Sequence, residues 1–142
     1  MTTTTEIQNE IIENFSLFDG DMESTLFYLM DLGKKLPTMS VTNQTDNYIV
    51  KGCQSKVWVY PTLEDGKVNF EANSNTEITK GLVYLLWSIW NGKSPDEILA
   101  TELIFIDKIG MSRMIGSQRS NGFASMIKQM KLYALAYKNM TI

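Results

Sequence analysis

The sequence predicts an α+β fold in which helices at both ends of the chain cover a three-stranded antiparallel sheet, forming a two-layer sandwich. Apolar residues recur at helical spacing near both ends, whereas residues 43–72 are rich in the β-branched and aromatic types that favour strands. The apolar stripes of the helices would cover one face of the sheet. At 142 residues, we expect one domain over residues 1–142, with only residues 1–5 disordered.

Two helices are predicted before the sheet. The first fits a capping box, Thr5-Glu6-Ile7-Gln8, in which Thr5 is the N-cap, and Asp19-Gly20 ends it. Its apolar stripe is Ile7, Ile11 and Phe15. Asp21 can cap the second helix, and Pro37 follows its end. The inner face of the second helix would be Leu26, Leu29, Met30 and Gly33.

Three strands are predicted in the middle of the chain. Tyr48-Ile49-Val50 and Val57-Trp58-Val59-Tyr60 have strand-like composition, and the short connection between them indicates an antiparallel hairpin. Cys53 would lie near the tip of this hairpin. Glu64-Asp65-Gly66-Lys67 is a second turn, after which Val68-Asn69-Phe70 begins the third strand.

Helical periodicity returns after residue 74. Ser74-Asn75-Thr76-Glu77 fits a capping box, and Asn91-Gly92 ends the helix that it opens. The apolar face of this helix is Ile78, Leu82, Leu85, Leu86 and Ile89. Ser94-Pro95-Asp96-Glu97 opens a short helix, and residues 104–111 fit either another short helix or a turn. Ser117 can cap a long last helix whose inner residues would be Phe123, Met126, Ile127, Met130, Tyr133 and Tyr137.

Composition narrows the class of protein. The net charge of −3 and pI near 4.9 argue against a nucleic-acid partner, which requires a clustered positive field. No apolar stretch approaches the roughly 20 residues of a membrane span, and the first residues lack the pattern of a signal peptide. A single cysteine permits no internal disulfide, which suits a reducing compartment. We therefore expect a cytoplasmic protein without membrane or nucleic-acid partners.

Cys53 is the only cysteine, and the chain contains no histidine. Catalysis by a Cys-His or Ser-His pair is therefore excluded, as is a histidine-ligated zinc site. One thiol cannot form a CxxC pair or hold an iron–sulfur cluster by itself, so we expect this chain to bind no metal or cofactor. If Cys53 reacts, its partner group comes from outside. The residues alone leave open the alternative that Cys53 is a small buried apolar residue.

Four segments, in order and together covering roughly residues 6–138, resemble the SufE family of sulfur acceptors for group II cysteine desulfurases. They are Leu32-Gly33-Lys34-Lys35-Leu36-Pro37, Gly52-Cys53-Gln54-Ser55 followed by Val57-Trp58, Ser74-Asn75-Thr76-Glu77-Ile78-Thr79-Lys80-Gly81-Leu82, and Ser117-Gln118-Arg119-Ser120-Asn121-Gly122-Phe123-Ala124-Ser125-Met126. Two departures are Asn75, where many members carry aspartate, and Phe123, where leucine is usual. The family aspartate lies near the docking region, so Asn75 would affect partner affinity or choice.

The resemblance implies a SufE/NifU-like sandwich and a persulfide carrier of sulfurtransferase type. Cys53 would accept sulfane sulfur from a SufS-like desulfurase, stimulate that enzyme, and pass the sulfur to a SufB-like iron–sulfur scaffold. The pyridoxal phosphate of this system belongs to the desulfurase. The residues assigned to partner binding or loop support are Gly52, Gln54, Ser55, Lys56, Asn75 and Arg119.

Several alternatives remain at this stage. The chain could be a non-catalytic binding module that activates a desulfurase allosterically. An IscU-type scaffold is disfavoured because cluster ligation needs several cysteines or equivalents. Lys56 or the backbone amides of the turn could favour the thiolate, and Arg119 could contact the desulfurase or be an exposed solubilising residue. We also expect Cys53 to be shielded in the free protein and to swing out on docking.

Overall fold

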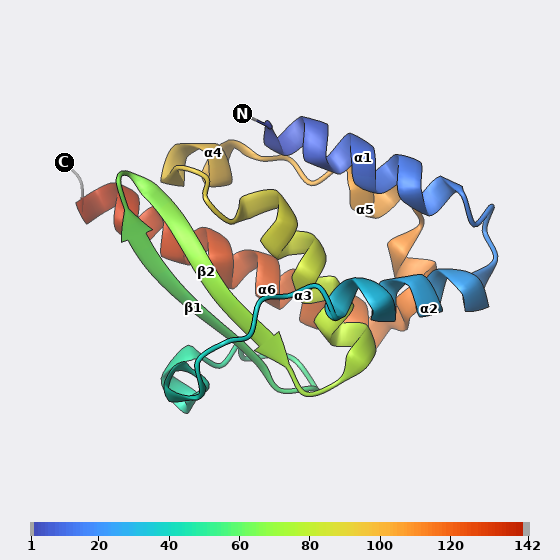
Figure 1. Cartoon of the computed structure of the whole chain (residues 1–142), viewed down its shortest axis with the longest axis horizontal. Coiled ribbons are helices and arrows are strands. Elements are labelled where there is room, and N and C mark those ends of the chain that lie inside the picture. Colours follow the sequence, from blue (N-terminus) through green and yellow to red (C-terminus); the bar gives the residue numbers. More distant parts are fainter. Residues whose placement is uncertain (1, 141–142) are drawn as a thin grey trace.

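The structure, a computed structural model, describes residues 2–140. Helices occupy both ends of this region, and a single β-hairpin lies between them (Figure 1). The elements in order are α1 (Thr4–Ser16), α2 (Met22–Gly33), the 3₁₀ turns η1 (Val41–Asn43) and η2 (Asp46–Tyr48), β1 (Val57–Glu64), β2 (Lys67–Ser74), α3 (Glu77–Trp90), α4 (Pro95–Ala100), α5 (Phe105–Lys108) and α6 (Met111–Met140). The α+β prediction with helices at both ends is confirmed.

The sheet has two strands within residues 2–140, so the prediction of a third strand at residues 48–50 is wrong. Tyr48 belongs to η2, and only an isolated bridge between Ile49 and Trp58 remains of the expected pairing. The Val50 N–H donates to the Val57 carbonyl (2.7 Å). Pairing cannot extend further, because the 3₁₀ turn precedes these two residues and Gly52, at φ 94°, turns the chain away after them.

The hairpin of β1 and β2 has the predicted turn. Glu64 pairs with Lys67 across the two-residue connection, where Asp65 and Gly66 have φ values of 51° and 77°. Two successive positive φ values match the right-handed twist of the flanking strands, which explains the Asp-Gly sequence.

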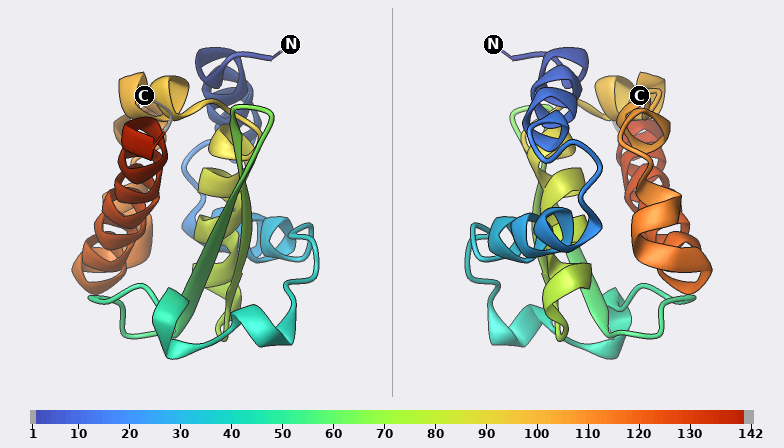
Figure 2. Two further views of the ribbon diagram at one scale, coloured as in Figure 1. Left: turned by 90° about the vertical axis from the view of Figure 1, so that its left-hand side faces the viewer. Right: turned by 90° about the vertical axis from the view of Figure 1, so that its right-hand side faces the viewer.

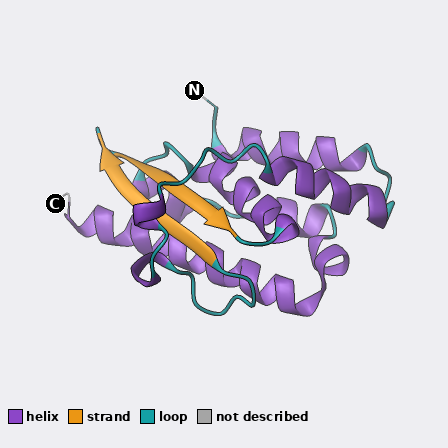
Figure 3. Ribbon diagram, turned by 60° about the horizontal axis from the view of Figure 1, so that its bottom comes forward, coloured by secondary structure: helices purple, strands orange, loops and turns teal. Residues whose placement is uncertain are grey.

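Helix α3 lies at the centre of the molecule, between α2 and α6 (Figure 2). Its buried residues include Leu82, Leu85, Leu86 and Ile89, as the helical stripe predicted. One face of the hairpin is buried in the same core through alternate residues, which are Val57, Val59, Val68, Phe70 and Ala72. The segment around η1 bonds the opposite face: the Ser40 N–H donates to Glu71 (2.9 Å) and Asn73 donates to Gln44 (3.2 Å). Figure 3 shows this segment passing in front of the strands.

The close contact between α2 and α3 depends on two glycines, one in each helix. A Cβ on Gly81 of α3 would lie 2.1 Å from the Leu29 carbonyl oxygen, and one on Gly33 of α2 would lie 2.9 Å from the Gly81 nitrogen. Only glycine therefore allows α2 and α3 to approach this closely. The contact fixes the N-terminal half of α3, which carries part of the candidate site.

Helix α1 begins earlier than predicted. Its capping box is formed by Thr3 and Glu6 rather than by Thr5 and Gln8, and Thr4 and Thr5 are helical. These threonines belong to the segment that was expected to be disordered, of which Met1 lies outside the described residues. Gln8 is buried instead: its amide donates to the Glu102 carbonyl (3.0 Å) and accepts from the Phe105 N–H (3.2 Å).

Of the predicted N-terminal caps of α2, α3 and α4, two are confirmed and one is wrong. The Asp21 cap of α2 and the Ser94/Glu97 capping box of α4 are confirmed. The Ser74/Glu77 box is wrong, because Ser74 is the buried last residue of β2 and pairs with Val57, which leaves Thr76 as the N-cap of α3.

Residues 104–111 contain the short helix α5. Within α6, Gly116 (φ 81°, ψ 170°) is non-helical and stands one residue before the predicted cap. No helix in the described chain is long and apolar enough to cross a membrane.

Candidate functional site

Cys53 lies on residues 51–54, here called the Cys53 loop, and the chain is anchored on both sides of it. Before the loop, Val50 is bonded to Val57. After it, the Ser55 hydroxyl lies 2.8 Å from the Thr76 hydroxyl and accepts from Thr79 (3.4 Å). The loop is therefore a short segment between two fixed points, one on β1 and one on the first turn of α3.

Asn75 forms a second anchor after the loop. Its side-chain Oδ1 accepts from the Lys56 N–H (2.9 Å), and its backbone N–H donates to the Lys56 carbonyl (3.2 Å). An aspartate would present the same acceptor, so the local hydrogen-bonding role does not require the family's usual residue. Lys56 contributes through its backbone, and its side chain is exposed.

The Cys53 thiol is half-buried against α6. Its Sγ donates to the Gly122 carbonyl oxygen at 3.4 Å. Burial raises the pKa of the Cys53 thiol above its ordinary value, because loss of water disfavours the thiolate. In this conformation the sulfur is held as a neutral thiol, which is a poor nucleophile.

Two glycines lie where the loop meets α6. A Cβ on Gly122 would lie 3.4 Å from the Cys53 Sγ, an ordinary contact distance, so this position tolerates a small side chain. A Cβ on Gly52 would lie 2.6 Å from the Ser125 Oγ, and the φ of 94° is one that other residues rarely adopt. Gly52 therefore supports the loop in two ways, by its conformation and by its size.

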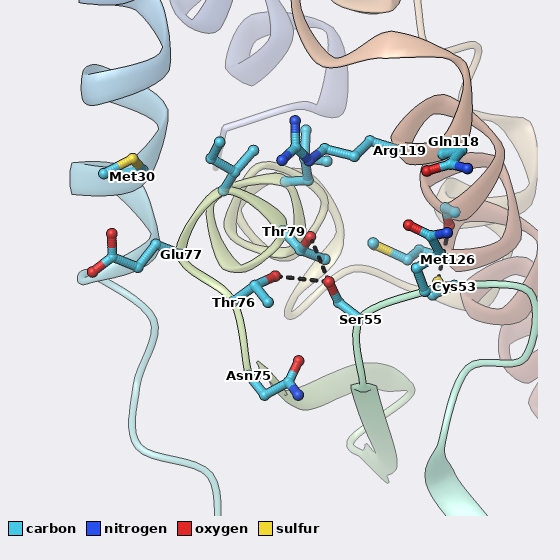
Figure 4. A pocket seen from close by; sticks show the side chains of 14 residues that line it. Met30, Cys53, Ser55, Asn75, Thr76, Glu77, Thr79, Gln118, Arg119 and Met126 are labelled. Carbon is cyan, nitrogen blue, oxygen red and sulfur yellow. Dashed lines mark hydrogen bonds between the residues drawn. The ribbon is translucent and has the colours of Figure 1, made fainter.

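A cleft of about 480 Å³ opens beside Cys53, between the N-terminal turn of α3 and α6 (Figure 4). Its charged lining residues are Glu77 and Arg119, both exposed. The Arg119 side chain extends from α6 toward α3 (Figure 4). The full lining is Met30, Cys53, Gln54, Ser55, Asn75, Thr76, Glu77, Ile78, Thr79, Leu82, Gln118, Arg119, Gly122 and Met126.

Most of the residues assigned from the sequence meet at this cleft. Gln54, Ser55, Asn75 and Arg119 line it together with Cys53, whereas Gly52 and Lys56 support the loop from outside the lining. Sequence reasoning gave no role to Thr76, Thr79 or Gly122, although all three lie inside the resembling segments. Their roles depend on contacts between distant parts of the chain, so local pattern could not assign them.

The site offers a thiol and hydrogen-bonding groups. Among residues 2–140, no three histidine, cysteine or acidic side chains gather in a way that could hold a metal ion. What the arrangement can do is present one sulfur atom in a partly enclosed cleft, open to a second molecule.

Comparisons with known proteins identify the family of this chain. Residues 9–134 match the model of the SufE family, described as an iron–sulfur (Fe-S) metabolism associated domain. An uncharacterized SufE-like protein of Rhizobium meliloti is 36% identical over 128 residues, covering 87% of this chain and 91% of that protein. An uncharacterized SufE-like protein of Synechocystis is 34% identical over 129 residues, covering 91% and 80% respectively.

The fold has a solved counterpart. The solution structure of a hypothetical protein from Thermus thermophilus superposes with a TM-score of 0.76 at 19% identity, and the match covers all of both chains. This likeness concerns the fold, whereas the family match rests on sequence over most of the chain. The chain belongs to the SufE family of proteins associated with iron–sulfur metabolism.

Proposed function

We propose that this protein is a sulfur carrier that accepts sulfane sulfur on Cys53 from the persulfide of a group II cysteine desulfurase. The observation that supports this most strongly is the position of Cys53. The only thiol of the chain lies beside a cleft of about 480 Å³ lined by residues of three family-like segments. A single sulfur atom with no metal-ligand companions suits transfer better than cluster assembly.

The proposed step is an exchange between sulfur atoms. The Cys53 thiolate attacks the terminal sulfur of the partner's persulfide, the partner's S–S bond breaks, and the partner's cysteine leaves as a thiolate. Cys53 then carries a persulfide, and the oxidation level of the transferred sulfur is unchanged, so no external oxidant or reductant is required. The rate depends on the thiolate fraction of Cys53 and on access to its sulfur.

The closed position of Cys53 restrains this step in the free protein. The thiol is half-buried, its pKa is raised by burial, and it donates to the Gly122 carbonyl. Docking to a desulfurase would draw the Cys53 loop away from α6 and place the sulfur in the partner's site. The pyridoxal phosphate that generates the persulfide belongs to that partner, and a SufB-like scaffold would receive the sulfur.

The test is the intact mass of the protein after incubation with a group II desulfurase and cysteine, beside the matched variant Cys53→Ser. We expect a gain of one sulfur atom that a reductant removes and that the variant lacks. Desulfurase turnover is measured in the same mixtures. No mass gain with turnover still raised by both proteins would support the binding-only activator instead, and no mass gain with no stimulation would refute both functions.

A further inference from the structure

One hydrogen bond holds the Cys53 loop against α6. Within the described residues, the bond from Cys53 Sγ to the Gly122 carbonyl is the only one that joins residues 51–54 to another part of the chain. Packing also holds the loop on α6: Gly52 lies close to Ser125, and the Cys53 side chain packs on Gly122 and against the hydrophobic core. The anchors at Val50, Ser55 and Lys56 lie outside the loop, so they do not fix its position on the helix.

This bond depends on the proton of the sulfur. A thiol is a weak donor, and a carbonyl oxygen can only accept, so the contact exists only while Cys53 is protonated. A thiolate placed there would face the negative end of the carbonyl dipole at short range in a half-buried position, where such repulsion is strengthened. The contact at Gly122 thus accepts a neutral sulfur and rejects an anionic one.

Loading with sulfur changes both the charge of Cys53 and its ability to donate a hydrogen bond. A persulfide has one more sulfur atom than a thiol, and its terminal S–H is a stronger acid than a thiol because the neighbouring sulfur atom stabilises the anion better than a carbon atom does. The loaded residue is therefore an anion at neutral pH, whereas the empty residue is a neutral thiol there. The original Sγ, now bonded to the second sulfur, has no proton to donate.

We propose that the Gly122 carbonyl distinguishes the empty from the loaded carrier: it retains the Cys53 loop on α6 as a thiol and releases it once Cys53 carries a persulfide. This inference rests on the proposed function and adds that loading itself exposes the cargo. The empty carrier is closed and the loaded one is open, so the recipient does not need to open the loop.

The charged residues around the cleft also favour release of the loaded loop from α6. Glu77 and Arg119 are the charged residues that line the cleft, Lys51 lies within the loop and Lys56 follows it; all four are exposed. Arg119 would attract a persulfide anion toward the open rim of the cleft, away from the buried Gly122 backbone. Glu77 lies on the α3 side of the cleft, remote from Cys53 (Figure 4).

The experiment compares the position of the Cys53 loop in the empty and the loaded protein, read from the backbone amide NMR signals of Gly122 and Ser125, which the loop contacts in the closed state. Loading uses inorganic polysulfide under anaerobic conditions and is verified by intact mass, so it is independent of any desulfurase. We expect the ratio of open to closed loop to rise about 2- to 12-fold, the change that loss of one hydrogen bond supports, and to return after reduction. The capped helix α4 provides the internal reference, because its amide signals should not move.

A matched pair of variants separates charge from size. Cys53→Asp places an anion at the site, and Cys53→Asn places a neutral group of the same shape that can donate to the Gly122 carbonyl. We expect the α6 signals of the open loop in the aspartate variant and signals near those of the empty wild type in the asparagine variant. The same fraction of open loop in the two variants, or loaded protein that stays as closed as empty protein, would overturn the inference.

The two proposals fail in different ways. If polysulfide-loaded protein opens but a desulfurase adds no sulfur, the discrimination at Gly122 is supported and the carrier function is refuted. If a desulfurase loads Cys53 but the loop stays closed on α6, the carrier function is supported and the discrimination at Gly122 is refuted.

Discussion

Substitution of Gly52 by alanine tests whether the closed loop shields the thiol. The structure predicts two costs in the closed state. The φ of 94° lies where a side chain is strained by about 1–3 kcal/mol, and the new Cβ would lie 2.6 Å from the Ser125 Oγ. The loop can relieve both by leaving α6, because its anchors at Val50 and Ser55 are outside it.

The backbone strain of an alanine at residue 52 by itself predicts a large increase in the exposure of the Cys53 thiol. At about 1.4 kcal/mol per factor of ten, a cost of about 1–3 kcal/mol raises the ratio of open to closed loop by roughly 5- to 150-fold. The assay is the rate at which a bulky aromatic disulfide modifies Cys53, measured with excess reagent. If opening precedes modification, the rate should rise by that factor until the loop is mostly open.

Two further variants make the result specific. Gly20, in the α1–α2 connection, also has a positive φ (78°), and a Cβ there would meet nothing within 4 Å. Gly20→Ala should therefore lower the free energy of unfolding without changing the thiol rate. Gly52→Ala combined with Ser125→Ala removes the close contact and keeps the strain, so its rate should lie between those of wild type and Gly52→Ala. A wild-type thiol rate in Gly52→Ala would refute the closed-loop interpretation.

Three other outcomes are expected. Gly81→Ala should lower the free energy of unfolding in urea by about 3 kcal/mol, because its Cβ would lie 2.1 Å from a backbone oxygen of α2; a loss below about 1 kcal/mol would contradict the close helix contact. Gln8→Ala should lower the free energy of unfolding by about 1–3 kcal/mol, mainly by leaving the buried Phe105 N–H without its partner, whereas the exposed neighbour variant Asn9→Ala should cost little. The raised pKa of Cys53 means that the folded protein keeps a proton that the unfolded chain has lost, so stability should fall as pH rises from the ordinary thiol pKa toward the folded value. Cys53→Ser should lack this component of the pH dependence, and identical profiles for the two proteins would count against the burial of the thiol.

Local sequence predicted the features that depend on neighbouring residues. The stripe of Leu82, Leu85, Leu86 and Ile89 defines a helical face whatever packs against it. Ser94 and Glu97 cap α4 through atoms three residues apart, and Asp-Gly at 65–66 forms a turn within four residues. These interactions are short in sequence, so the pattern contains all the partners.

Predictions failed where several local solutions were available. Thr3 with Glu6 and Thr5 with Gln8 both fit a capping box, and the choice depends on Gln8, which is taken by backbone groups at residues 102 and 105. Ser74 could have capped α3, but pairing with Val57 places it in β2. Residues 48–50 have strand composition, yet the turns on either side leave too few residues free to pair.

The sequence by itself determined the helical faces, the position of Cys53 on a connection before a strand, and the family-like segments around it. Tertiary structure alone decided how those segments meet. Gly33, Gly52 and Gly81 all lie in the segments, and the reason for a glycine at each is the close approach of a distant backbone or side chain, which no local pattern reports. The hydrogen bond of the Cys53 thiol also depends on tertiary structure. Its acceptor, the Gly122 carbonyl, lies 69 residues away in the chain and reaches Cys53 only when α6 packs beside the hairpin.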